Sequence, residues 1–226
     1  MKIKYPLILV NFKTYEESQG RRALALAKVA ERVGKEYGVC IAVVPQYVDI
    51  PLIVNNTSVP VFAQHVDPEM PGSHTGHITP ESVKEAGAVG SLLNHSERRL
   101  SLEVIDGAVR RCRSLEQMTC VCAETVMVGK SFAALNPDMI AIEPPELIGS
   151  GVSVSKAKPK VITNSVRMIK AVNPKIHVLC GAGVTNGEDV ATALKLGSKG
   201  ILVASGVVKA KDPEAVLRDF AEHMQR

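Results

Sequence analysis

Short, continuous apolar runs recur along the whole chain, and amphipathic segments separate them. Each run holds four to six residues and lacks the alternation of a half-exposed sheet, which is typical of parallel strands buried on both faces. The pattern predicts eight such strands, at residues 7–10, 39–44, 61–64, 91–94, 119–123, 139–142, 177–180 and 200–204.

Helical signals fill the intervals between these strands. Residues 21–35 carry an apolar stripe at helical spacing, with charged side chains mostly off it. Residues 79–81 (Thr-Pro-Glu) and 212–214 (Asp-Pro-Glu) each read as an N-cap, a proline at the first helical position and an acid in the first turn. Ser101 and Asn186 are weaker N-cap candidates.

The repeat of strand and helix predicts the fold class. Eight units in 226 residues give roughly 28 residues per unit, close to the spacing of a (β/α)8 barrel. An open doubly wound α/β sheet could use the same units, but no G-x-G-x-x-G motif follows the first strand. Because no linker or change of composition interrupts the chain, we expect one (β/α)8 TIM barrel domain spanning residues 1–226.

Composition and charge narrow the class of function. The net charge of +4 suits an anionic small molecule, whereas 4% aromatic residues and no dense Lys/Arg run argue against nucleic acid. No apolar run reaches the ~18 residues of a membrane span, and residues 7–10 read as a first strand and not as a signal peptide. The five cysteines, an odd number mostly in or beside apolar runs, predict reduced thiols and a cytoplasmic location.

The active site of a barrel lies at the carboxyl ends of its strands. Asn11 and Lys13 leave the first strand two residues apart, so an amide and an ammonium face the same way and can hold an oxyanion. Glu143 ends the sixth strand, and the following prolines and Gly149–Gly151 bracket Leu147 and Ile148, as expected for a lid. Taken alone, a solvated lysine and an ordinary Pro/Gly loop remain alternatives.

Small residues follow the seventh and eighth strands. Gly183, Ala204 and Ser205 would let backbone N–H groups approach an anion closely. The loops after these two strands are the usual phosphate-binding loops of barrel enzymes. We therefore expect a phosphate site between them.

The segment 94–99, Asn-His-Ser-Glu-Arg-Arg, becomes ionic directly after a buried strand. We expect a short helix to begin near Ser96, which would place His95 at the positive end of a helix dipole and keep its imidazole neutral. A neutral histidine can donate a hydrogen bond to a carbonyl oxygen. The alternative is a solvated charged loop.

The charged residues of the same segment have expected partners. Glu97 could pair with Lys13 and fix its position, and Arg98 or Arg99 could tie the turn to a neighbouring loop. The segment would then be the polar rim of a catalytic site.

These motifs together resemble the triosephosphate isomerase family, in the same order along the whole chain. The matching segments are Asn11-x-Lys13, 73–81, 94–99, 143–151, 181–183 and 204–206. The resemblance implies an aldose–ketose isomerase that interconverts dihydroxyacetone phosphate and D-glyceraldehyde 3-phosphate through an enediolate. It implies no metal and no organic cofactor.

The resemblance also implies a role for each matching residue. Glu143 would be the base, His95 the electrophile, Lys13 the cation and Asn11 an oxyanion-hole amide. Asn11 and Lys13 would also contact substrate, together with the implied phosphate-binding positions Ile148, Gly149, Gly183, Ala204 and Ser205.

Several features depart from the common family pattern. The chain is short and has no Trp, His77 stands where a glutamate is common, and Ala204-Ser205 replaces paired glycines. These features look like the compact archaeal branch, whose members are often tetramers. We therefore expect a homo-oligomer, either a dimer or a tetramer, and the resemblance favours the tetramer. The third loop (65–79) would insert into a second subunit, with Thr75 near its tip.

Two other functions stay open at this stage. A sugar-phosphate epimerase would need metal ligands or paired aspartates at the rim, and neither is found. A catalytically silent binding relative would have lost Glu143, His95 or Lys13. His65, His74 and His77 could be read as a metal site, but a polar loop at a subunit contact is the favoured interpretation.

Overall fold

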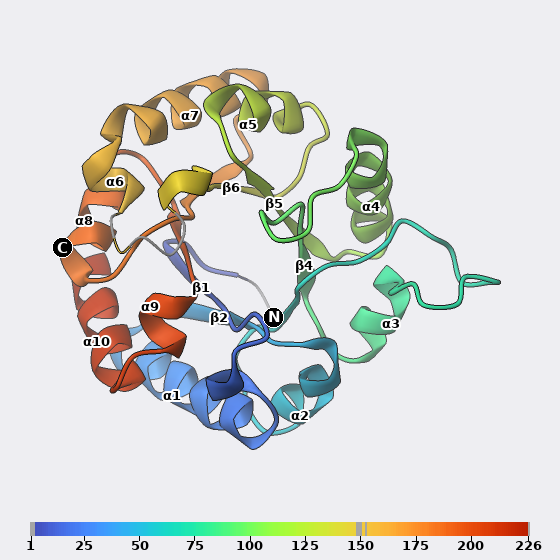
Figure 1. Cartoon of the computed structure of the whole chain (residues 1–226), viewed down its shortest axis with the longest axis horizontal. Coiled ribbons are helices and arrows are strands. Elements are labelled where there is room, and N and C mark those ends of the chain that lie inside the picture. Colours follow the sequence, from blue (N-terminus) through green and yellow to red (C-terminus); the bar gives the residue numbers. More distant parts are fainter. Residues whose placement is uncertain (1–2, 148–150, 152, 226) are drawn as a thin grey trace.

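Eight parallel strands form one sheet that closes into a barrel, with helices on its outside (Figure 1). This arrangement comes from a computed structural model, which describes residues 3–147, 151 and 153–225. Hydrogen bonds join the strands in the order β2-β1-β8-β7-β6-β5-β4-β3. The strands are β1 (Leu7–Asn11), β2 (Cys40–Val44), β3 (Phe62–Ala63), β4 (Gly90–Leu93), β5 (Met118–Ala123), β6 (Met139–Ile142), β7 (His177–Cys180) and β8 (Gly200–Val203).

The barrel closes where β2 meets the start of β3. A single parallel bridge joins Val43 to Val61, and the Val43 N–H donates to the carbonyl of Pro60 at 3.0 Å. Gln64, predicted as the last residue of this strand, instead donates its side-chain amide to the carbonyl of Lys13 at 2.8 Å. The predicted barrel is confirmed, and the open doubly wound sheet is not formed.

The four predicted N-cap residues are confirmed. The side chains of Thr79, Ser101, Asn186 and Asp212 all accept a hydrogen bond from a backbone N–H of the first turn. The α-helices are α1 (Arg21–Tyr37), α2 (Ile50–Val54), α3 (Pro80–Glu85), α4 (Leu102–Ser114), α5 (Val126–Ala133), α6 (Val154–Ala157), α7 (Pro159–Val172), α8 (Gly187–Lys195), α9 (Ser205–Val208) and α10 (Pro213–Met224). Short 3-10 turns are η1 (Glu16–Ser18), η2 (Tyr47–Asp49) and η3 (Pro145–Leu147).

The sheet buries apolar side chains on both faces, which explains the continuous runs in the sequence. One cluster fills the barrel interior with side chains such as Leu9, Phe62 and Met139. A larger cluster packs the outer face of the strands against the helices. Because both faces are packed, polar residues of the strands are displaced to their ends, where the site is built.

All five cysteines are free thiols, and four of them are buried. Within the described ranges, no helix combines the length and the hydropathy needed to cross a membrane.

Candidate active site

A cavity of about 200 Å³ opens at the carboxyl ends of the strands. It is small beside the ~300–1,000 Å³ pockets of drug-sized ligands, so it suits a molecule of a few heavy atoms. The structure brings seven predicted site residues to its wall: Asn11, Lys13, His95, Glu143, Gly183, Ala204 and Ser205. The predicted supporting residue Glu97 lines an adjoining cavity with Lys13 and His95. The predicted positions Ile148 and Gly149 lie outside the described residues.

The end of β1 directs a lysine into the cavity. Asn11 is buried, and its side-chain oxygen accepts a hydrogen bond from the backbone N–H of Lys13 at 2.9 Å. This local bond stabilises the positive φ of Lys13, 47°, a conformation that non-glycine residues seldom adopt. The Lys13 ammonium then lies 2.8 Å from the carboxylate of Glu97, as predicted.

The segment after β4 is a turn and not the expected helix. Asn94 has a φ of 57°, and the N–H of Arg98 donates to the carbonyl of His95 at 2.8 Å. The Asn94 side chain accepts from the N–H of Leu100 and donates to the carbonyl of Cys122, both at 2.9 Å. Asparagine tolerates the left-handed conformation, and these two bonds hold the turn, so no helix forms until α4 begins at Leu102.

His95 is neutral for a reason other than the one predicted. Burial, and after it the nearby Lys13 ammonium, lower its pKa to about 4. The backbone N–H of Glu97 lies 3.3 Å from Nδ1 of His95, which assigns Nδ1 as the acceptor and places the proton on Nε2. The Nε2–H therefore faces Glu143, whose Oε1 lies 3.6 Å away.

Glu143 is a buried carboxyl group at the end of β6. Only 2% of its surface is exposed, and this burial raises its pKa to about 7, against the opposing effects of the Cys122 thiol and Lys13. Its Oε2 has no hydrogen-bond partner among the described residues. A side chain at position 181 would approach its Cγ to 2.6 Å, so Gly181 makes room for Glu143.

The arginines of the turn connect it to its neighbours, as predicted. Arg99 pairs with Glu124, after β5, at 2.7 Å and donates to the carbonyl of Asn94 at 3.0 Å. Arg98 lies 3.8 Å from Asp67 in the third loop. These contacts fix the turn that carries His95.

The loops after β7 and β8 present unpaired backbone donors to the cavity. The N–H groups of Gly183, Ser205 and Gly206 donate to no residue that the structure describes. The two loops touch, because a side chain at position 206 would lie 2.8 Å from the carbonyl oxygen of Val184. Free N–H groups from adjacent loops are the arrangement that an oxyanion or phosphate requires.

The structure adds two polar wall residues, Tyr15 and Thr185, that were not predicted from the sequence. Tyr15 lines the cavity, and Lys209 lies over its ring at 4.7 Å from the centroid. Thr185 follows the small-residue turn after β7 and also lines the cavity. Their positions near strand ends were the only signal in the sequence, and that signal is shared by many loop residues.

The residues expected to form a lid are described only in part. Leu147 ends η3 and is buried in the outer core, and the neighbouring Glu146 pairs with Lys158. Gly151 has a φ of 74° and lines the cavity. The lid itself remains a prediction.

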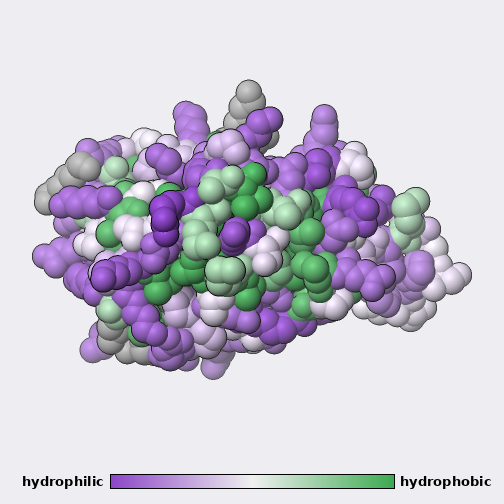
Figure 2. Space-filling view, turned by 90° about the horizontal axis from the view of Figure 1, so that it is seen from above, coloured by the Kyte–Doolittle hydropathy of each residue, from purple (hydrophilic) through white to green (hydrophobic). Residues whose placement is uncertain are grey.

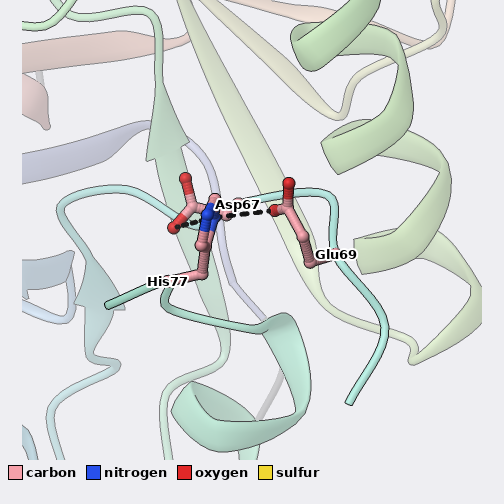
Figure 3. A group of neighbouring side chains, drawn as sticks. All are labelled: Asp67, Glu69 and His77. Atoms are coloured by element: carbon pink, nitrogen blue, oxygen red, sulfur yellow. Dashed lines mark ion pairs between the residues drawn. The ribbon is translucent and has the colours of Figure 1, made fainter. Parts of the chain in front are cut away.

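The histidines of the third loop do not converge on one point. His77 instead meets two carboxylates, with Nδ1 at 3.2 Å from Glu69 and 3.6 Å from Asp67 (Figure 3). His65 pairs with Asp67 at 2.8 Å, whereas His74 only packs edge-on against His77. Three groups this close can hold a divalent ion, but Asp67 already accepts from His65 and from the N–H of Ile78. We interpret the cluster as polar contacts that hold the base of the loop.

Fold and site together define a class. A barrel with a carboxyl group of raised pKa, a neutral histidine and a lysine at its carboxyl rim belongs among the (β/α)8-barrel enzymes that perform acid–base chemistry.

Comparison with known proteins identifies the family. The model of the family described as triosephosphate isomerase matches residues 6–223. A triosephosphate isomerase of Methanocaldococcus jannaschii is 52% identical over 95% of this chain and 98% of its own length. Those of Methanothermus fervidus and Methanobacterium bryantii are 50% and 51% identical, over 97% and 95% of this chain and 99% and 95% of their own lengths. The chain belongs to the triosephosphate isomerase family.

Proposed function

We propose that this protein interconverts dihydroxyacetone phosphate and D-glyceraldehyde 3-phosphate, with Glu143 as the base. The observation that carries the proposal is the pairing of a buried carboxyl group, pKa about 7, with a neutral histidine 3.6 Å away. A base is most effective when its pKa lies near the working pH. The combination of glutamate base and neutral histidine is the established pattern in triosephosphate isomerases.

The proton transfers follow from the orientation of the groups. The Glu143 carboxylate takes a proton from C1 of dihydroxyacetone phosphate, and the released electron pair forms a C1–C2 double bond. The carbonyl oxygen at C2 becomes an oxyanion, which Lys13 and the Nε2–H of His95 stabilise. His95 gives its proton to that oxygen and takes one from the oxygen on C1, and Glu143 returns its proton to C2.

The substrate phosphate would occupy the loops after β7 and β8. The free N–H groups of Gly183 and Ser205 support this placement, and Ala204 leads into the same turn. Ile148 and Gly149 complete the proposed phosphate contacts by resemblance alone. Binding energy from the phosphate would then go into closing the site around the reacting carbons.

The two alternatives lack support at the rim. All three groups that a silent relative would have lost, Glu143, His95 and Lys13, line one cavity. The cluster of Asp67, Glu69 and His77 lies in the third loop, and none of the three lines the cavity that holds Glu143.

A coupled assay tests the proposal. Purified protein is supplied with dihydroxyacetone phosphate, and the aldehyde product is oxidised by an NAD-linked dehydrogenase. Ribulose 5-phosphate is supplied in a parallel assay. We expect turnover of the triose phosphate only, and epimerisation of the pentulose without triose turnover would overturn the assignment.

Self-association is part of the same proposal, as is a cytoplasmic location. The third loop extends outward between β3 and α3 (Figure 1), residues 70–77 are exposed, and Met70 has 62% of its surface exposed. Apolar side chains also gather in the middle of the face that Figure 2 shows, and α4 and α5 expose Leu102 and Met127. Apolar surface of this kind is typical of subunit contacts.

Light scattering after size exclusion tests the assembly. We expect a dimer or a tetramer of the 24.2 kDa chain. A fully active monomer at the concentration of the assay would contradict it.

A further inference from the structure

The buried carboxylate of Asp189 contacts both the loop after β7 and the segment that follows the expected lid. Asp189 lies in the first turn of α8, and 2% of its surface is exposed. Its Oδ2 accepts from the backbone N–H of Thr185 at 3.0 Å and from the Thr185 hydroxyl at 3.2 Å. Thr185 lines the cavity, so Asp189 contacts the wall without reaching the cavity itself.

Asp189 also contacts residues 153–156, the segment that follows the expected lid. Its Oδ1 pairs with the ammonium of Lys156 at 2.9 Å. Its backbone carbonyl accepts from the hydroxyl of Ser155 at 3.2 Å, and Ser155 shares a 2.7 Å hydrogen bond with Ser153. Both serines are buried. A single residue therefore fixes the positions of two chain segments that reach the site from different strands.

The position of Thr185 matters for the anion donors. The carbonyl of its neighbour Val184 sits so close to Gly206 that no side chain fits between them. Moving the loop after β7 would therefore shift the loop after β8 as well. Since both loops carry the unpaired N–H groups, the geometry of the whole anion site depends on this anchor.

Charge gives Lys156 a separate role. An unpaired carboxylate buried behind an anion site would repel a phosphate dianion, and the effect would be strong because few waters screen it. The ammonium of Lys156 neutralises that charge, and Glu188 contacts the same ammonium only at 3.4 Å with an exposed side chain.

We propose that Asp189 is a positioning residue for phosphate binding: it fixes Thr185 and the segment Ser153–Lys156 relative to each other. Lys156 neutralises the charge of Asp189. This inference rests on the proposed function, because it takes the anion to be the substrate's phosphate. It concerns affinity for the phosphate group and leaves the proton transfers at Glu143, His95 and Lys13 unchanged.

The test measures competitive inhibition by inorganic phosphate in four single variants and one double variant. Asp189→Ala should raise the inhibition constant about tenfold or more, and Asp189→Asn, which keeps an acceptor for the Thr185 N–H, about threefold. Lys156→Gln should also raise it about threefold, but should add nothing in the Asp189→Asn background. Glu188→Gln, the matched exposed control, should leave it unchanged.

Turnover of D-glyceraldehyde, which has no phosphate, separates positioning from general damage. We expect this turnover to stay within about twofold in all variants, while KM for the triose phosphate rises. An inhibition constant does not depend on the folded fraction, so partial misfolding cannot imitate the effect. If Asp189→Ala does not fold, the double-mutant cycle of Asp189→Asn and Lys156→Gln still tests the inference.

The results overturn this inference separately from the proposed function. If the wild-type protein isomerises triose phosphate but both Asp189 variants keep the wild-type inhibition constant, only the inference is wrong. Equal losses with and without the substrate phosphate would also contradict it. If the wild-type protein does not isomerise, phosphate affinity is measured by calorimetry, and absence of binding by the wild type overturns the inference too.

Discussion

Replacing Glu143 by glutamine should abolish most turnover, and it should make the fold more stable relative to the wild type as the pH rises from 5 to 8. The carboxyl group has an ordinary pKa of 4.5 when unfolded and about 7 in the folded protein. Between these values the unfolded chain loses the proton and the folded one keeps it, so stability falls as pH rises. At 1.36 kcal/mol per pH unit, the raised pKa of Glu143 costs about 0.8 kcal/mol of stability at pH 5 and about 3.3 kcal/mol at pH 8.

Glutamine removes this pH-dependent cost. Its amide also leaves a donor beside the position of the unpaired Oε2, which should cost about 1–3 kcal/mol at every pH. The difference in unfolding free energy between variant and wild type should therefore shift by about 2.5 kcal/mol in favour of the variant from pH 5 to pH 8. Turnover should fall by about 10²–10⁴-fold, since the base is lost.

Urea unfolding at both pH values and one fixed protein concentration measures the shift. Glu146→Gln, three residues away, is the control: Glu146 is exposed and its pKa is lowered by Lys158, so it is ionised at both pH values. A stability difference that is equal at pH 5 and pH 8 would refute the buried, proton-binding state of Glu143. Turnover within tenfold of the wild type would reject it as the base.

Three further predictions concern the same site. The value of kcat/KM should rise with pH through a midpoint near the Glu143 pKa of about 7, because the base must be ionised. His95, with a pKa of about 4, should add no second step to this pH profile. A midpoint near 6 would report ionisation of the substrate phosphate instead. Glu97→Gln should lower kcat/KM about tenfold or more by releasing Lys13, whereas Glu103→Gln, exposed on α4, should not; equal values would disprove the positioning role. Dialysis against a chelator should leave activity unchanged, and recovery on adding a divalent ion would contradict this.

Much of the fold was predictable because local and global signals agree. Continuous apolar runs mark strands that are buried on both faces, and polar residues such as Thr79 and Asp212 cap helices through bonds within one turn. The rim rule for barrels then placed Lys13, His95 and Glu143 in one cavity.

The remaining features depend on contacts between distant segments. The turn after β4 replaces the expected helix because Asn94 bonds to Cys122, 28 residues away. The β3 strand is cut to two residues because Gln64 turns toward Lys13. Likewise, the pKa values of His95 and Glu143 result from burial by several strands, which no single segment reveals.

Isomerisation in deuterated water tests the central claim most directly. If Glu143 transfers a proton through an enediolate, NMR should detect deuterium at C2 of the glyceraldehyde 3-phosphate formed from dihydroxyacetone phosphate, and at C1 of the recovered substrate. Glu143→Gln should lose conversion and exchange together. Product that forms at the wild-type rate with no deuterium at either carbon would show a direct hydride shift and would contradict the account.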